Sequence, residues 1–230
     1  MIGATSQRRT AADTRSRVYW LLADFFRARP DPEFLARLAA PPQDDEAGRD
    51  VTAPALAQLR AMLVEDTPEA MAERLAPEYT RLLGGLKRGY GPPPPFESLY
   101  REAARPGAAI PTVMGAYLDA GFGVVDEALG PQDHVSAELK FMALACYRES
   151  EAWAQGATQE AIVWLERQRA FLDRHLLAWL PALCDALRAA AREPYFRHVA
   201  DLAEAACRAD REDLEDRLAR ADLGRHPGGA

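Results

Sequence analysis

The residues with the most evident capacity for chemistry lie in one short segment, residues 130–139, with the sequence GPQDHVSAEL. His134 and Glu138 are one helical turn apart, so on a helix their side chains would be neighbours. A histidine and a carboxylate at this spacing supply two metal ligands, whereas a zinc site needs three or four. The remaining histidines show neither HxxxH nor HExxH spacing. We therefore predict no metal site.

Ser98 is the serine to consider as a nucleophile, but it lacks the strand–GxSxG–helix setting that exposes such a residue. The sequence also contains neither GxxxxGK[ST] nor GxGxxG, the motifs that cradle phosphates. Ser98 and Asp133 are each expected to have a simpler role, as the N-cap of the helix that follows. These patterns predict a protein that is not an enzyme and uses no cofactor.

Charge and hydropathy exclude further classes of function. The chain of 230 residues has a formal net charge of −7, whereas a nucleic-acid-binding protein is expected to present a basic face. No apolar run approaches the roughly eighteen residues that span a bilayer. Arg8 and Arg9 resemble a twin-arginine export signal, but Asp13, Arg15 and Arg17 occupy the positions that its apolar region would need. We expect a cytoplasmic protein without stable membrane insertion.

A proline-rich segment separates two stretches of apolar and aromatic residues. Pro92 to Pro95 are four consecutive prolines, and each lacks an N–H and has φ fixed near −65°. The segment must therefore be extended and stiff. The residues beside it that could line a binding groove are Tyr79, Leu82, Leu83, Phe96 and Tyr100. Because successive helical residues point about 100° apart, we expect Leu82 in the core and Leu83 in the groove.

A helical period of 3.6 residues recurs along the chain, and alternating strand patterns are not visible. The predicted fold is all-α, a compact bundle of about ten helices that could divide into two packed subdomains. We expect a disordered tail at 1–13, a helical domain at 14–222 with a soft boundary near 103–110, and a flexible tail at 223–230. The helix that follows Asp133 has a predicted core stripe of Val135, Leu139, Met142 and Cys146.

Several motifs in this order resemble the TorD/DmsD family, whose members are helical cytosolic chaperones for molybdenum-cofactor redox enzymes. The run EYTRLL–G from position 78, PPFESLY at 94–100 and GPQDHVSAELKFM at 130–142 carry the resemblance. LERQRAFLDRHLLAWL at 165–180, with Pro181, and EPYF at 193–196 are similar to two further family segments. The resemblance covers about residues 78 to 200.

The resemblance implies a chaperone whose partner is the catalytic subunit of a molybdopterin oxidoreductase, together with its twin-arginine signal peptide. Such a chaperone holds the apo-subunit for cofactor insertion before export. Carboxylates beside an apolar groove suit this ligand, since arginine favours planar bidentate partners. The implied contact residues are Tyr79, Leu82, Leu83, Phe96, Glu97, Ser98, Tyr100, Asp133, His134 and Glu138.

Two questions stay open at the level of the sequence. The alternative function is a helical protein-interaction adaptor that has no signal-peptide role. The family resemblance allows either a monomer or a domain-swapped dimer, with residues 103–110 as a plausible hinge.

Overall fold

The computed structural model describes residues 2–40, 53–85, 89–101 and 109–225. These residues form ten α-helices and no strand, which confirms the predicted all-α class. The helices are α1 (Ile2–Arg27), α2 (Pro32–Ala39), α3 (Ala53–Leu63), α4 (Pro68–Leu83), α5 (Glu97–Arg101), α6 (Ala109–Asp119), α7 (Val135–Ala154), α8 (Thr158–Phe171), α9 (Leu177–Ala190) and α10 (Pro194–Arg225).

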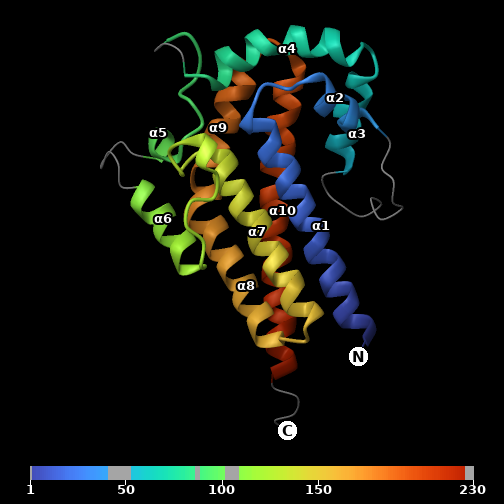
Figure 1. Ribbon diagram of the computed structural model, residues 1–230, viewed down its shortest axis with the longest axis vertical. Helices are drawn as coiled ribbons and strands as arrows, with labels where there is room; N and C mark the ends of the chain where they lie inside the picture. The colour runs from blue at the N-terminus through green and yellow to red at the C-terminus, as the bar shows by residue number, and fades with distance from the viewer. Residues whose placement is uncertain (1, 41–52, 86–88, 102–108, 226–230) are drawn as a thin grey trace.

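The long helices α1, α7, α8, α9 and α10 form the body of the molecule (Figure 1). Helix α1 packs along α7, α7 packs against α8, and α10 contacts α8 and α9. Helix α4 lies across one end, with α2 and α3 beside it, while α5 and α6 flank the bundle near the start of α7 (Figure 1). In the described part of the chain, no helix is long and apolar enough to cross a membrane.

Helix α7 lies at the centre and is buried on nearly every side. The predicted core stripe is confirmed, because Val135, Leu139, Met142 and Cys146 are all fully buried. Its other face is also enclosed, however, and Glu138 has no exposed surface. A helical segment that is enclosed all round must satisfy its polar side chains within the protein. The polar groups in the first part of α7, from Ser136 to Lys140, are therefore part of the interior.

The predicted helix at 158–180 is two α-helices joined by a π-helical turn, Leu172–Leu176. The N–H of Leu177 donates to the carbonyl of Leu172, five residues back, in place of the usual four. A π-turn widens the helix and often occurs where a side chain serves a special role. Here the turn contains the buried His175.

The predicted disorder of residues 1–13 is wrong for residues 2–13, because α1 begins at Ile2 and buries Ala12. Amphipathic contact with the neighbouring helices extends α1 beyond the apolar stripe that the sequence shows. At the other end α10 reaches Arg225, into the predicted tail, and residues 226–230 lie outside the described residues. The predicted boundary at 103–110 also falls mostly outside them.

Arg15 joins four helices of the bundle from a buried position. Its guanidinium donates to Glu149 of α7 at 2.9 Å, and it also contacts Gln168 of α8 and Asp210 of α10. Burial alone would lower the pKa of Arg15, but the adjacent carboxylates raise it well above its ordinary value. Tyr19 donates a further hydrogen bond to Asp210 at 2.7 Å. This network fixes how α1 packs on the other helices.

Replacing Arg15 with alanine should destabilise the fold by about 3–5 kcal/mol, because Glu149 and Asp210 would remain buried without their cation. Urea unfolding of Arg15→Ala beside the wild type measures this. The matched control is Arg148→Ala, which removes an exposed pair with Glu151 and should change stability by about 1 kcal/mol or less. Equal effects of the two variants would contradict the role of Arg15.

Candidate functional site

The proline loop and the start of α7 are joined through their backbones. The N–H of Val135 donates to the carbonyl of Pro95 at 2.9 Å, and the N–H of Glu97 donates to the carbonyl of Asp133 at 2.8 Å. Phe96 and His134 thereby form an isolated antiparallel bridge. The two segments that the sequence singled out are thus one structural unit.

Asp133 stabilises α5 rather than the helix that follows it. Its carboxylate accepts from the N–H of Ser98 at 3.1 Å. The N-cap of α7 is His134, whose Nδ1 accepts from the N–H of Ser136 at 3.1 Å. Both predicted caps are therefore wrong, since Ser98 lies inside α5 and Asp133 caps α5 from across the bridge. The bridge holds His134 in an extended conformation, which moves the start of α7 one residue onward, to Val135.

His134 is held as a neutral imidazole. Burial lowers the pKa of His134 to about 4. The negative charge of Asp126 opposes this shift, and the positive charge of Lys140 adds to it. Since Nδ1 accepts a hydrogen bond, the neutral ring carries its proton on Nε2. The ring meets Phe96 edge-on, with 5.0 Å between centroids.

Two buried glutamates meet beneath the bridge. Burial raises the pKa of Glu138 well above its ordinary value, and the negative charge of Glu97 raises it further. These effects favour the protonated form of Glu138. One oxygen of its carboxyl group accepts from the indole N–H of Trp179 at 3.1 Å, while the other is buried without a hydrogen-bond partner among the described residues. Glu97 also lies 3.0 Å from Nδ1 of His175 and contacts the guanidinium of Arg101. This group, named the carboxyl cluster, consists of Glu97, Glu138, His175, Trp179 and Arg101.

The groove-lining residues predicted on the helix before the proline loop are too buried to line an open groove. Leu82 and Leu83 are both buried, so the expectation that Leu83 lines an exposed groove is wrong. The hydroxyl of half-buried Tyr79 donates to the carbonyl of Phe26 at 2.9 Å. These side chains fix the end of α4 in the core.

The loop passes so close to α4 that glycine is required. A Cβ on Gly91 would lie 2.0 Å from the carbonyl oxygen of Arg81. Gly85 has a φ of 60°, and a Cβ there would lie 3.0 Å from Pro94. Both positions exclude larger residues, so the end of α4 and the proline loop form one rigid contact.

The surface of this unit is apolar. Tyr90 and Leu99 are 56% and 52% exposed, while Phe96, Ser98 and Tyr100 are half-buried. The hydroxyl of Tyr100 donates to the carbonyl of Pro93 at 2.7 Å, and its ring lies 5.6 Å from that of Trp179. We name the side chains of Tyr90, Phe96, Leu99 and Tyr100 the proline-loop surface.

Sequence reasoning missed Tyr90, Leu99, Arg101, His175 and Trp179. The segment FLDRHLLAWLP at 171–181 was the signal for two of them, because it places a histidine and an indole N–H among apolar residues. A hollow of 530 Å³ borders the carboxyl cluster between α6 and α8, and its lining includes Arg101, Phe141, Phe171, Arg174 and His175. Across the described residues, no group of three or more His, Cys, Asp or Glu side chains is arranged to hold a metal ion.

The family described as "Nitrate reductase delta subunit" matches residues 45–185, which include both bridged segments. The match spans more than half of the chain, so the chain belongs to the nitrate reductase delta subunit family. This confirms the resemblance to TorD/DmsD-type chaperones.

The chain is also similar to the perchlorate reductase assembly chaperone protein of Dechloromonas aromatica (strain RCB), with 31% identity over 119 residues. The alignment covers 49% of this chain and 51% of the relative, so the chain spans about half the length of the curated relative it matches.

The proton that Glu138 keeps in the folded protein should appear in the pH dependence of stability. Unfolding exposes Glu138, whose pKa then falls to its ordinary value, so the unfolded state releases a proton above about pH 4.5. Wild-type stability should therefore decline from pH 5 to pH 8 through this group. Glu138→Gln keeps a hydrogen-bond donor at this position and removes the titration. The stability of the variant minus that of the wild type should therefore be more favourable at pH 8 than at pH 5.

Urea unfolding at both pH values measures this difference, and Glu166→Gln, at an exposed position of α8, is the control. A Glu138→Gln variant whose stability difference from wild type is the same at pH 5 and pH 8 would contradict a protonated Glu138.

Proposed function

We propose that this protein is a client-specific chaperone for a molybdopterin oxidoreductase. It binds the twin-arginine signal peptide and the apo-form of the catalytic subunit, and it holds that subunit for cofactor insertion before export or assembly. The observation that carries this proposal is the rigid, apolar proline-loop surface mounted directly over buried carboxylates. Family membership and the name of the perchlorate reductase chaperone support the same function.

The apolar part of a signal peptide suits the proline-loop surface. Leu99 and Tyr90 expose large apolar area on a loop whose backbone is fixed by the bridge to α7. Burying such area contributes roughly 25 cal/mol per Å². Because the loop is already rigid, little conformational entropy is lost when a peptide binds. Docking of an apolar peptide face against such side chains is a recurrent mode of recognition.

The arginine pair of the signal peptide suits the carboxyl cluster. Glu97 is fully buried, but its partner Arg101 has a side chain 39% exposed and contacts the carbonyl of Arg174 at the surface. A guanidinium from the client can replace that of Arg101 at Glu97 without leaving the carboxylate unpaired. Asp133 has one buried oxygen without a partner in the described residues, which a second donor could use. In the absence of the client, the guanidinium of Arg101 occupies the place at Glu97 that a client arginine would take.

This function places the protein in the cytoplasm, where the client is assembled before export, and requires no catalysis by the chaperone itself. The surface is supported from beneath by four buried residues, Asp133, Glu138, Leu82 and Leu83. The client reaches Glu97 when its guanidinium replaces that of Arg101. His134 orients Phe96 by its ring contact. The apolar contacts with the client therefore come from the exposed side chains of the loop and α5, and the contacts with its arginines come from Glu97 and Asp133.

Leu99→Asp should weaken binding of a synthetic twin-arginine signal peptide by about tenfold or more, because an apolar contact is replaced by a charge. Isothermal titration gives the affinity. Val64→Asp is the matched control, since Val64 is 69% exposed and lies after α3, away from the loop. Co-purification of each variant with the native client tests in cells whether Leu99→Asp binds less client than Val64→Asp. If both variants bind like the wild type, the proline-loop surface is not the client site.

Arg101→Gln should raise the affinity for a peptide carrying two arginines, because Glu97 would no longer be occupied by an internal guanidinium. The same peptide with two lysines should gain less, since an ammonium group lacks the bidentate fork. Titration of both peptides against wild type and Arg101→Gln measures the difference. A helical adaptor without a signal-peptide role would bind neither peptide and would still co-purify with a folded partner.

A further inference from the structure

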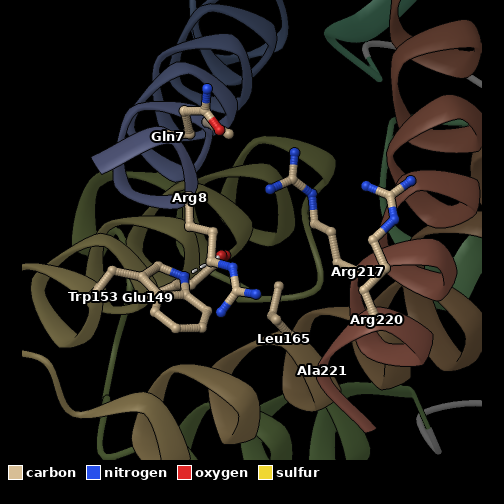
Figure 2. A pocket seen from close by; sticks show the side chains of 9 residues that line it. Gln7, Arg8, Glu149, Trp153, Leu165, Arg217, Arg220 and Ala221 are labelled. Carbon is tan, nitrogen blue, oxygen red and sulfur yellow. Dashed lines mark hydrogen bonds between the residues drawn. The ribbon is translucent and has the colours of Figure 1, made fainter. Parts of the chain in front are cut away.

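A second hollow, with a volume of 330 Å³, lies at the other end of α7 from the proline loop. Helix α7 has 20 residues and is therefore about 30 Å long, which separates this hollow from the carboxyl cluster. The hollow lies between α1, α7, α8 and α10, and we name it the arginine pocket (Figure 2). It is lined by Gln7, Arg8, Ala11, Glu149, Trp153, Leu165, Arg217, Arg220 and Ala221.

Three guanidinium groups reach this pocket from two helices. Arg8 projects from α1 beside the indole ring of Trp153, while Arg217 and Arg220 project from α10 on the other wall (Figure 2). The guanidinium carbon of Arg8 lies 4.8 Å from the ring centroid of Trp153. Trp153 is itself held in place, because its N–H donates to Glu149 at 3.0 Å. One wall of the pocket is thus a fixed aromatic ring that carries a cation.

The carboxylate in the lining does not neutralise these arginines. One oxygen of Glu149 accepts from Trp153, and the other accepts from Arg15 at 2.9 Å and from Gln168 at 3.1 Å. Glu149 therefore belongs to the buried network behind the pocket. Its ion-pair partner is Arg15, which also pairs with Asp210 and does not line the pocket.

The other acidic partners of the arginines are weak competitors for a ligand. Arg217 pairs with Asp213 at 2.5 Å and Arg220 with Asp216 at 3.5 Å, each one turn back on α10. The Arg220–Asp216 pair is exposed and contributes little, and Asp213 is itself 42% exposed, so an anion in the pocket can take the place of these carboxylates. Within the described part of the chain, Arg8 forms no ion pair. The pocket therefore offers an anion one guanidinium without a carboxylate partner and two whose partners can be exchanged.

We propose that the arginine pocket binds a phosphate-bearing small molecule. The guanidinium fork matches phosphate oxygens in bidentate geometry, and converging arginines supply the charge for it. A volume of 330 Å³ lies near the lower bound of small-molecule sites, which is about 300 Å³, so the ligand is a compact one. Trp153 and Leu165 offer an apolar wall for its organic part.

Isothermal titration with pyrophosphate and with phenyl phosphate, at constant ionic strength, tests this proposal. Wild-type protein should bind both saturably. Arg8→Gln and Arg217→Gln should each weaken binding by about tenfold or more, as expected for the loss of a charge-assisted hydrogen bond. Arg148→Gln, on the exposed side of α7, is the matched control and should bind like wild type.

Three results would overturn the proposal. They are an absence of saturable binding to wild-type protein, equal affinities in the pocket variants and the control, and binding of citrate as tight as that of pyrophosphate. Affinity for the twin-arginine peptide should be unchanged in Arg8→Gln, because the two sites lie at opposite ends of α7. This readout separates failure of the pocket from failure of the chaperone function.

Discussion

The structure around the candidate site depends on two helix starts that cap each other. A helix leaves its first N–H groups without partners, and prolines offer carbonyls but no N–H. The carbonyl of Pro95 satisfies the first N–H of α7, while Asp133 satisfies Glu97 with its carbonyl and Ser98 with its carboxylate. Each segment supplies what the other lacks. The proline loop therefore has one position relative to the bundle.

The carboxyl cluster extends this constraint to the π-turn before α9. Burial and the nearby negative charge of Glu97 raise the pKa of Glu138, so Glu138 keeps its proton. From the other side, His175 contacts Glu97 and Trp179 donates to Glu138. Loop, α7 and π-turn are thereby joined through polar contacts in the interior. A rigid base of this kind suits the peptide-binding role that we propose for the surface above it.

The two ends of α7 have opposite electrostatic character. At its start, buried carboxylates lie under an apolar surface, with Arg101 against Glu97. At its end, arginines line a hollow that has an aromatic wall. The ligands we propose follow this division, a cationic peptide with an apolar segment at one end and a phosphate-bearing molecule at the other. The long central helix keeps the two sites apart, so each can be altered without changing the other.

The sequence by itself determined the helical class, the core stripe of α7 and the two segments that form the candidate site. These features depend on local periodicity and on the missing N–H of proline, which act wherever the chain folds. Tertiary structure alone decided that Asp133 caps α5, that Leu83 is buried, and that Glu97, His175 and Trp179 meet around Glu138. It also decided that α1 is ordered from Ile2. Those outcomes depend on contacts between distant segments, because burial and the pKa shifts that it causes arise only when helices pack together.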